Sequence, residues 1–427
     1  MLPRLLRTLV IIFPLIGLAQ PPPNIVIIMA DDMGWGDVGF HDGDVPTPHL
    51  DGLTASGLEL ERFYVFPSCS PTRASVLSGL LPHRLGIPAP VRPSDPGLPV
   101  DAPLLPLVLQ AHGYLTAMIG KWHLGGANNP EQRPHYRGFD QFYGSYQTGL
   151  DYFTHEGSRG TKDWWRNDEV ADETGYITRL QASEGAKLIC ETEDPLFLFF
   201  APHAPHSPIQ APAETVAKFS HLTGPSAPTY GAMIAEFDDA VGKLLAAITD
   251  SGEADNTIVI FFSDNGGIRF SDIGDFRGMK NTLYEGGIRA PFVINWPGVT
   301  NIGTHTAQLS AVMDLMPTLL TAAGVPAAAI PESDGIDLRS VFAGEGTVQR
   351  DPIIIGNHQY VFITSEWKLV ENGITTELYR IDSDPTESTD LAASEPEKLA
   401  ELAAQLSDRV ADLPIFEARA QRRRRNQ

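Results

Sequence analysis

Four apolar segments, spread over more than half of the chain, each end in a group of polar residues. The segments are residues 24–30, 114–119, 195–201 and 257–262. Their continuous apolar character is typical of strands that are buried on both faces of a parallel sheet. The polar groups that follow them are Asp31-Asp32, Lys121 with His123, His203 with His206, and Asp264-Asn265. Because ligands bind beyond the carboxyl ends of strands in open parallel sheets, we expect these groups to converge on one site.

Helical patterns separate these strands. The first predicted helix begins at Thr47-Pro48 and stops at Gly57, and a further strand is predicted over residues 61–66. Other helical patterns cover residues 104–111, 177–191 and 230–251, whereas residues 126–176 are rich in glycine, asparagine and aromatic residues and are predicted to be irregular. Alternating strands and helices indicate a doubly wound α/β domain, with a large sheet flanked by helices.

The sequence changes character after about residue 326. Four short strand-like runs lie between residues 353 and 381, and a helical pattern follows over residues 395–413. This predicts a small antiparallel sheet with a helix packed on it. Since 427 residues are long for one domain, we expect a catalytic domain over residues 20–350 and a C-terminal subdomain over residues 351–427. The arginines at 422–425 are expected to form a solvated tail.

Residues 1–19 have the pattern of a signal peptide. Arg4 and Arg7 precede an apolar run over residues 9–18, and Gly17 and Ala19 are small residues spaced for cleavage after Ala19. The run is shorter than the ~20 residues that a membrane-spanning helix needs. We therefore expect export to a periplasm or to the outside of the cell, with no stable membrane anchor.

The chain is strongly acidic, with a formal net charge of −22. Such a surface repels nucleic acid and anionic membranes, so neither is expected as a partner. An anionic substrate would have to meet a local cluster of positive groups.

The chain contains two cysteines, and we expect no disulfide between them. Cys190 lies in the helical pattern over residues 177–191, where a buried free thiol is the ordinary arrangement. Cys69 opens the segment Cys69-Ser70-Pro71-Thr72-Arg73, which has the features of a helix start and reaches a natural stop at Gly79. Because a helix N-terminus has unpaired N–H groups and a positive dipole, this position suits an anion.

Four residues at the strand ends offer only oxygen ligands: Asp31, Asp32, Asp264 and Asn265. Crowded carboxylates repel one another unless a cation lies between them. An oxygen-only set favours Ca²⁺ or Mg²⁺ over zinc. Taken alone, Asp31-Asp32 is better explained as a strand end with a helix cap, and Asp264-Asn265 as a turn. Their shared position after apolar strands favours a metal site.

A second set of residues is basic: Arg73, Lys121, His123, His206 and Lys280. His203, close to prolines, is interpreted as structural. A divalent cation with several basic groups is what a tetrahedral oxyanion ester requires. The cations neutralise its oxygens, and a histidine can protonate the leaving alkoxide.

These motifs together resemble the formylglycine-dependent sulfatases of the alkaline-phosphatase superfamily. Cys69-Ser70-Pro71-Thr72-Arg73 with Leu77-Ser78-Gly79 is similar to the first signature of that family, and Gly113-Tyr114 through Gly120-Lys121-Trp122-His123 is similar to the second. Further likenesses are Ser263-Asp264-Asn265-Gly266-Gly267, Lys280 through Arg289, and Trp367-Lys368-Leu369 with Glu377-Leu378-Tyr379. The likeness runs in order from about Asn24 to about Ala392, and implies an alkaline-phosphatase-like fold.

The resemblance implies a sulfuric ester hydrolase of the arylsulfatase type. In such enzymes the cysteine at position 69 is oxidised to formylglycine by a maturation enzyme that reads Cys-x-Pro-x-Arg in the unfolded chain. One hydroxyl of the aldehyde hydrate attacks sulfur and displaces the alcohol, and loss of a proton from the second hydroxyl expels sulfate. The implied roles are Ca²⁺ binding by Asp31, Asp32, Cys69, Asp264 and Asn265, support of the nucleophile by Arg73 and Lys121, base catalysis by His123, acid catalysis by His206, and sulfate binding by Lys280.

The stretch from Gly149 to His155, with His206-Ser207-Pro208-Ile209-Gln210, resembles the branch that contains arylsulfatase B, the N-acetylgalactosamine-4-sulfatase, and related polysaccharide sulfatases. This implies a sulfated carbohydrate as substrate. Asp151 and His155 are expected to bind the sugar. For Trp164 and Trp165, stacking on a sugar and packing within the loop are equally compatible with the sequence.

Two other functions remain open at this stage. A phosphomonoester or phosphonate hydrolase of the same superfamily is the first, but such relatives often bind two metals and the sequence offers one set of oxygen ligands. The second is a catalytically silent protein that binds sulfated glycans, which would be expected to lack Cys69, a lysine or a metal-binding carboxylate.

Overall fold

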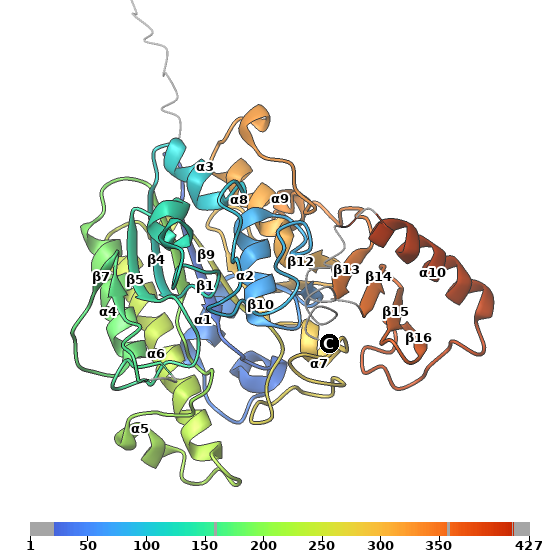
Figure 1. Cartoon of the computed structure of the whole chain (residues 1–427), viewed down its shortest axis with the longest axis horizontal. Helices are drawn as coiled ribbons and strands as arrows, with labels where there is room; N and C mark the ends of the chain where they lie inside the picture. The colour runs from blue at the N-terminus through green and yellow to red at the C-terminus, as the bar shows by residue number, and fades with distance from the viewer. Residues whose placement is uncertain (1–20, 158–159, 357–358, 412, 414–427) are drawn as a thin grey trace, which may run out of the picture.

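The computed structural model describes residues 21–157, 160–356, 359–411 and 413. The predicted signal peptide over residues 1–19 and the arginine tail at 422–425 lie outside the described residues. Figure 1 shows a large α/β unit and a smaller unit at its side, which contains β13 to β16 and α10.

Within the described residues, a ten-stranded sheet forms the centre of the large unit. Its strands are, in spatial order, β11 (Thr304–Thr306), β2 (Leu58–Leu60), β10 (Phe292–Asn295), β9 (Thr257–Ser263), β1 (Asn24–Ala30), β8 (Leu196–Ala201), β4 (Leu115–Lys121), β5 (Gln141–Ser145), β6 (Trp165–Arg166) and β7 (Glu169–Val170). β10 runs antiparallel to β9 and β2, so the sheet is mixed. A separate pair, β3 (Phe63–Tyr64) and β12 (Ser310–Ala311), is parallel.

The four strands with polar ends are neighbours in this sheet. β9, β1, β8 and β4 are adjacent and mutually parallel, with Val26 of β1 opposite Val259 on one side and Leu198 on the other. Their side chains are buried almost throughout. Since parallel neighbours end at the same edge, the prediction that the four polar groups converge is confirmed.

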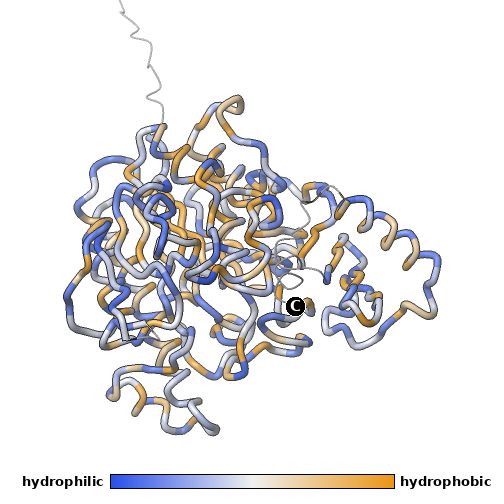
Figure 2. The backbone as a smooth tube through the Cα atoms, viewed as in Figure 1, coloured by the Kyte–Doolittle hydropathy of each residue, from blue (hydrophilic) through white to orange (hydrophobic). Residues whose placement is uncertain are grey.

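Helices cover both faces of the sheet, which gives three layers. Ile25, Ile27 and Met29 face a core that includes residues of α2, α3 and α8, whereas Val26 and Ile28 face a second core with α1, α4 and α6. The hydrophobic segments in Figure 2 concentrate on the central strands. The helices are α1 (Pro48–Ser56), α2 (Cys69–Ser78), α3 (Leu105–Ala111), α4 (Ile177–Glu191), α5 (Ala213–Lys218), α6 (Ala227–Asp250), α7 (Glu285–Ile288), α8 (Leu315–Ala322), α9 (Arg339–Phe342) and α10 (Pro396–Ala411).

Three elements differ from the sequence-based expectation. Residues 126–176 are not wholly irregular, because β5, β6 and β7 extend the large sheet from this region. The strand predicted over residues 61–66 is limited to Phe63–Tyr64, and it pairs outside the large sheet. Cys190 is exposed rather than buried, although both cysteines are free as expected. It lies in the last turn of α4, where the helix leaves the core.

The C-terminal unit is a four-stranded antiparallel sheet, as predicted. Its strands, in order, are β13 (Ile353–Gly356), β14 (Tyr360–Ile363), β15 (Trp367–Glu371) and β16 (Thr376–Arg380). One face packs against Leu402 and Leu406 of α10. The other face joins the core of the large unit, through residues such as Ile355 and Val370. Because side chains alternate along the strands, one face of this sheet packs against α10 and the other face packs against the large unit.

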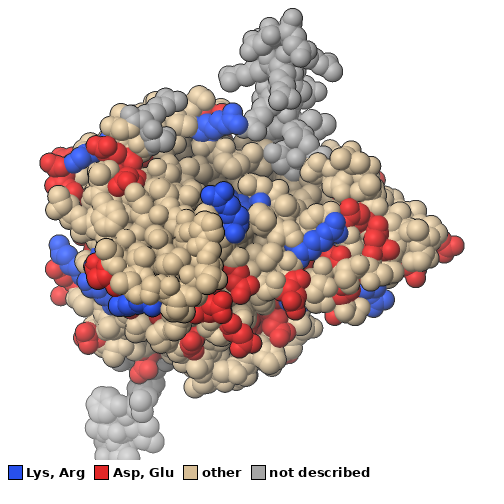
Figure 3. Space-filling view, turned by 90° about the horizontal axis from the view of Figure 1, so that it is seen from below, with Lys and Arg blue, Asp and Glu red and all other residues tan. Residues whose placement is uncertain are grey.

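Charges of both signs are interspersed on the surface. On the face drawn in Figure 3, acidic side chains lie along much of the lower part, and basic side chains occur in separate groups, one of them near the centre. Among the described residues, no helix is both long and apolar enough to cross a membrane.

Candidate active site

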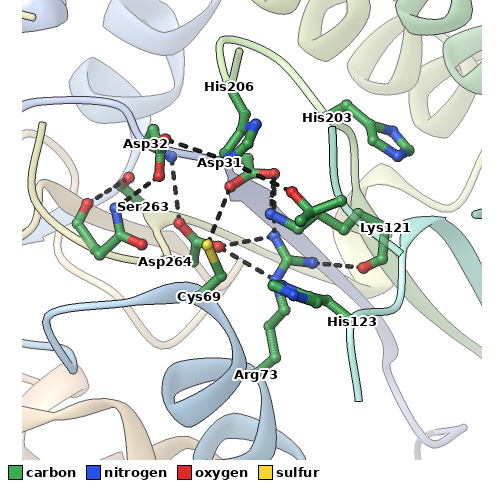
Figure 4. Close-up of polar contacts among 12 residues, drawn as sticks. Asp31, Asp32, Cys69, Arg73, Lys121, His123, His203, His206, Ser263 and Asp264 are labelled. Atoms are coloured by element: carbon green, nitrogen blue, oxygen red, sulfur yellow. Dashed lines mark hydrogen bonds and ion pairs between the residues drawn. The ribbon is translucent and has the colours of Figure 1, made fainter. Parts of the chain in front are cut away.

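The sheet edge brings the predicted polar residues into one buried cluster (Figure 4). Asp31 follows β1, Asp264 follows β9, and Lys121 ends β4. Lys121 Nζ lies 2.6 Å from Asp31 Oδ2, and Asp32 N donates to Asp264 Oδ1 over 3.2 Å. Asp31, Lys121 and Asp264 have no exposed surface, so their charges interact in a medium that screens them weakly.

A glycine allows the strands to approach closely just before Lys121. Gly120 has φ +120°, and a Cβ atom there would lie 1.9 Å from the carbonyl oxygen of Ala201 on β8. Any other residue would push β4 and β8 apart at the edge where the site is assembled. The Gly120-Lys121 sequence therefore fixes where Lys121 enters the cluster.

Cys69 is the first residue of α2, and Gly79 ends this helix in a left-handed conformation, as predicted. The Cys69 thiol lies 3.7 Å from Asp31 Oδ1 and 3.4 Å from Lys280 Nζ. Burial raises the pKa of the thiol to about 12. A neutral thiol is a weak nucleophile, so the position is well placed for chemistry while the unmodified residue is poorly suited to it.

Arg73 projects from the first turns of α2 into the same cluster. Its guanidinium donates to Asp264 Oδ2 over 2.8 and 3.2 Å and to the carbonyl oxygen of Lys121. Asp31 Oδ2 lies 3.7 Å away. Arg73 thus joins three of the four strand ends to the helix that presents residue 69.

The oxygen-rich part of the cluster fits a cation. Ligand atoms of Asp31, Asp32, Cys69 and His206 lie within 4.8 Å of one another. Asn265 Nδ2 donates to Asp32 Oδ1 over 2.9 Å, while Asn265 Oδ1 is buried and has no hydrogen-bond partner. A buried carbonyl oxygen without a donor is costly. Its presence beside three carboxylates fits a cation that takes oxygen ligands.

Lys280 enters the cluster from a loop rather than from a strand end. Its Nζ pairs with Asp32 Oδ1, and the side chain is 15% exposed. His206 is also 15% exposed, and its Nε2 lies 3.7 Å from Asp32 Oδ2 and 3.4 Å from Thr148 Oγ1. These partly exposed side chains lie where an entering substrate would meet the buried cluster.

The three histidines of the region have different surroundings. His203 is fully bonded, because its ring nitrogens contact Ser145 Oγ at 2.7 Å and Gln181 Nε2 at 3.0 Å, which agrees with a structural role. His123 is buried with an unpartnered Nδ1 and a φ of +57°. Burial, together with Lys121 and Arg73, holds the pKa of His123 well below its usual range, and burial also lowers the pKa of His206. A neutral imidazole can accept a proton, as the expected role of His123 as a base requires, whereas His206 must bind a proton before it can act as an acid.

The structure buries His155, one of the two residues expected to bind sugar, and also Trp164. His155 has no exposed surface, and its Nε2 contacts the carbonyl oxygen of Gly175 at 2.9 Å. Trp164 is also fully buried, 5.1 Å from the His155 ring. The expectation that His155 binds sugar is therefore corrected, since core packing occupies it, and Trp164 takes the loop-packing alternative. Trp165 is partly buried and its Nε1 donates to Asp163.

Asp151 organises its own loop and the loop that carries His206. Asp151 Oδ1 accepts from the N–H groups of Phe153 and Thr154, and Oδ2 accepts from Gln210 Nε2 over 2.7 Å. Its carboxylate lies in an array of donors that lowers its pKa against the effect of burial. A sugar would have to compete with these donors for its oxygens.

Sequence reasoning missed the residue that anchors His206. The buried Tyr152 places its hydroxyl 2.7 Å from the carbonyl oxygen of His203 and 2.8 Å from that of His206. Tyr152 lies in the stretch Gly149–His155 that was interpreted as part of a sugar site. The signal was present in that motif, but an aromatic residue in a loop does not reveal whether it contacts a ligand or the backbone.

Fold and site together define a class of protein: a three-layer α/β protein whose parallel-sheet edge surrounds a helix-borne Cys69 with carboxylates and basic groups. The chain belongs to the sulfatase family. The Sulfatase family model matches residues 23–325, and the model for the C-terminal part of N-sulphoglucosamine sulphohydrolase matches residues 275–415. The predicted family and fold are confirmed.

Characterised relatives carry sulfatase names. The chain is 37% identical over 315 residues to mouse arylsulfatase J, covering 70% of this chain and 52% of that protein. It is 33% identical over 399 residues to human N-acetylgalactosamine-6-sulfatase, covering 83% of this chain and 75% of that protein. The chain thus spans about half the length of the mouse relative. The particular likeness to arylsulfatase B is not confirmed.

Solved structures extend the comparison. The crystal structure of Ps i-CgsB in complex with k-i-k-neocarrahexaose has a TM-score of 0.85 and 30% identity, and covers 92% of this chain and 94% of that one. PsFucS1 sulfatase from Pseudoalteromonas sp. has a TM-score of 0.80 and 25% identity, with 92% of each chain covered. The fold is therefore shared with sulfatases along almost the whole described chain.

Proposed function

We propose that the protein is a sulfuric ester hydrolase that removes sulfate from sulfated carbohydrates. The observation that carries this proposal is the position of residue 69, buried between Asp31 and Lys280 at the N-terminus of α2. Membership of the sulfatase family supports the same reaction. The site offers cationic groups for the three non-bridging oxygens of a sulfate ester and histidines for the two proton transfers.

The proposed nucleophile is formylglycine hydrate, formed from Cys69 by a maturation enzyme that reads Cys69-Ser70-Pro71-Thr72-Arg73. One hydroxyl of the hydrate releases its proton to solvent and attacks sulfur as the sulfur–oxygen bond to the alcohol breaks. His206 donates a proton to the departing alkoxide oxygen. His123 then accepts the proton of the second hydroxyl, the carbon–oxygen bond to sulfate breaks, the aldehyde returns, and water adds to it to restore the hydrate. A serine or cysteine lacks the second hydroxyl and would remain as a covalent sulfate ester.

The side chains around residue 69 supply the charge that this sequence needs. Lys121 is buried against Asp31, and Arg73 is held by Asp264, so both are fixed before substrate arrives. Lys280 is partly exposed and is proposed to bind the sulfate group itself. Fixed charges in a poorly screened site stabilise a developing anion without a cost of reorganisation.

Ca²⁺ is the proposed metal, with Mg²⁺ as the less suitable ion. Asp31, Asp32, Asp264, Asn265 and residue 69 would hold it, and the unpartnered Oδ1 of Asn265 supports this set. Bound there, the cation would act as a Lewis acid that withdraws charge from the nucleophile and from the sulfate oxygens. Ca²⁺ tolerates a larger and more flexible set of oxygen ligands than Mg²⁺ does, which would suit a site with several carboxylates.

The proposed substrate class is a sulfated galactose-type sugar. Support comes from the names of two relatives, N-acetylgalactosamine-6-sulfatase and a structure in complex with k-i-k-neocarrahexaose. Sulfate release from 4- and 6-sulfated galactose, N-acetylgalactosamine and glucosamine sugars would test it. Equal rates on gluco- and galacto-configured sugars would contradict this substrate class without affecting the reaction.

Two measurements test the reaction itself. Nitrophenyl sulfate should be cleaved much faster than nitrophenyl phosphate, and the opposite preference would favour a phosphomonoesterase. Intact-mass spectrometry of active protein should show residue 69 as an aldehyde in place of a CH₂SH side chain. Active protein that retains the thiol would contradict the proposed nucleophile.

The proposal extends to maturation and location. Residues 1–19 are proposed to direct export and to be removed, which places the enzyme in a periplasm or outside the cell. The division into residues 20–350 and 351–427 is retained as a proposal, supported by the start of the C-terminal sheet at Ile353. The N-terminal residue of the secreted protein, determined by peptide sequencing, would test the cleavage site.

A further inference from the structure

The loop that carries Lys280 is packed closely against the metal-binding edge on one side. Lys280 N donates to the carbonyl oxygen of Gly267 over 2.9 Å, and Asn281 N donates to that of Pro67 over 2.8 Å. A Cβ atom on Gly266 would lie 1.9 Å from the carbonyl oxygen of Gly286. The backbone of the loop therefore lies directly on the turn that presents Asn265.

The C-terminal sheet holds the same loop from the other side. Glu377 of β16 accepts from Arg277 Nη1 over 3.2 Å, and from the Tyr284 hydroxyl over 3.1 Å. Arg277 also donates to the Tyr379 hydroxyl over 2.7 Å, and its guanidinium lies 3.8 Å from the centre of the Tyr284 ring. Arg277 and Tyr284 stand three positions before and four positions after Lys280, so Glu377 joins both ends of the segment that carries this lysine.

Glu377 is itself fixed by its own hairpin. Its carboxylate accepts from the Tyr379 hydroxyl over 2.6 Å, from Asn372 Nδ2 over 3.0 Å and from Thr375 Oγ1 over 3.2 Å. The side chain is 13% exposed. A single carboxylate with this many donors is a rigid anchor, because loss of its charge weakens every one of these bonds together.

We propose that Glu377 is a positioning residue for sulfate binding: it holds the loop between Arg277 and Tyr284 so that Lys280 Nζ stays beside Asp32 and residue 69. This inference rests on the proposed role of Lys280 in binding sulfate. It gives the C-terminal subdomain a part in the active site without a direct contact to substrate. Glu377 acts on the affinity for the sulfate group, whereas the buried nucleophile and histidines remain in place.

The test compares Glu377→Gln with wild type in the matured, metal-loaded enzyme. The KM for nitrophenyl sulfate and the dissociation constant of inorganic sulfate, measured by calorimetry, should each rise about fivefold, while kcat changes less than twofold. This size corresponds to a weakened charge-assisted hydrogen bond. Glu366→Gln is the matched control, since Glu366 pairs with Arg380 on the same subdomain without touching the loop. It should leave both constants unchanged.

A double-mutant cycle separates this proposal from its premise. Lys280→Ala alone should weaken sulfate binding, and Glu377→Gln should add no further loss in the Lys280→Ala background. An equal loss in both backgrounds, or unchanged sulfate affinity in Glu377→Gln, would overturn the positioning role. If Lys280→Ala itself binds sulfate as wild type does, the assignment of Lys280 fails, and the positioning role fails with it.

Discussion

Two buried clusters of opposite charges within the described residues differ in how their polar atoms are satisfied. The sheet-edge cluster lies beyond the central strands and consists of Asp31, Asp32, Arg73, Lys121, Asp264, Asn265 and Lys280. The interface cluster lies between α7 and the C-terminal sheet and consists of Tyr64, Glu285, Arg289, Lys368 and Glu387.

The interface cluster is closed around Glu285 and Lys368. Lys368 Nζ lies 2.7 Å from both Glu285 and Glu387 and has no exposed surface. The second oxygen of Glu285 accepts from the Tyr64 hydroxyl over 2.9 Å, and Glu387 accepts from the backbone N–H of Glu285 over 2.8 Å. This arrangement pairs the charges with one another and joins the two units of the fold.

The sheet-edge cluster is open by comparison. Asn265 Oδ1 is buried without a donor, and Lys280 is partly exposed. An unsatisfied buried group costs stability, and it persists where function requires it. Charge, burial and a positive φ do not distinguish the two clusters, because Glu387 of the interface cluster also has a φ of +56°. What distinguishes the sheet-edge cluster is an unmet amide oxygen beside several carboxylates, together with a partly exposed lysine.

The largest expected effect is a loss of activity when residue 69, beside the sheet-edge cluster, is replaced. Cys69→Ala should lower kcat/KM for nitrophenyl sulfate by about 10⁴-fold or more, because the nucleophile is lost. Calcium should still bind to the remaining oxygen ligands. Cys190→Ala is the control, since this exposed cysteine lies on α4 outside the cluster, and it should keep full activity. Retained turnover in Cys69→Ala would remove residue 69 from the mechanism.

The next largest effect is expected for the interface cluster, where a substitution should lower the free energy of unfolding. Lys368→Met leaves two buried carboxylates without their shared cation, which should lower the free energy of unfolding by about 3–5 kcal/mol. Denaturant titration of the metal-loaded protein would measure it. Lys187→Met removes an exposed lysine 3.9 Å from Glu191 and should cost less than about 1 kcal/mol. Equal midpoints for the two variants would show that the interface cluster contributes nothing to folding.

Much of the open cluster could be predicted from the sequence, because its residues follow strands with clear apolar patterns. Asp31, Lys121 and Asp264 each come directly after or at the end of a buried strand, and parallel pairing then brings them together. The family motifs added Arg73 and Lys280, whose positions no periodicity could give. Predicted helices also agree well with the structure where the apolar pattern has a clear helical period and sufficient length, as in α4 (Ile177–Glu191).

The interface cluster, and the directions of the side chains expected at a sugar site, could not be predicted in the same way. Lys368 lies in a strand between apolar residues, and a lysine beside tryptophan usually faces solvent, yet here it faces Glu285 from another unit. His155 and Trp164 stand in a loop, where sequence does not say which side chains turn inward. Contacts between units and side-chain directions in loops depend on tertiary packing.

A moderate effect on calcium affinity is expected at the proposed metal site. Asn265→Ala removes the unpartnered Oδ1, so the calcium affinity measured by calorimetry should fall about tenfold or more, within the range for loss of groups at metal sites. Chelation should lower the unfolding temperature of wild type more than that of the variant, because a ligand stabilises in proportion to its binding. Asn256→Ala, at a partly exposed position in the turn before β9, should behave as wild type. Equal calcium affinity in all three proteins would contradict the role of Asn265.

The smallest effect concerns how two carboxylates share one lysine. Burial raises the pKa of Glu387, and the nearby charge of Glu285 adds to the rise. Burial acts on Glu285 as well, but Lys368 and Arg289 outweigh it and hold the pKa of Glu285 below its usual range. Glu285 therefore stabilises the fold in its ionised form, and this contribution is lost as the pH falls below its unfolded value of 4.5. The pKa of Glu387 is higher in the folded protein, so its ionised form destabilises the fold. Wild type therefore gains stability from protonation of Glu387 as the pH falls.

The destabilisation caused by Glu285→Gln should therefore shrink between pH 7 and about pH 4, whereas that caused by Glu387→Gln should grow, each by about 1 kcal/mol. Parallel denaturant titrations at the two pH values would measure how the destabilisation by each substitution changes with pH. Glu366→Gln, which alters an exposed glutamate near Arg380, gives the pH dependence for an unburied carboxylate. A change of the same sign for the two buried glutamates would mean that Lys368 neutralises them equally. In that case the interface cluster would be satisfied throughout, and the contrast with the open sheet edge would be sharper still.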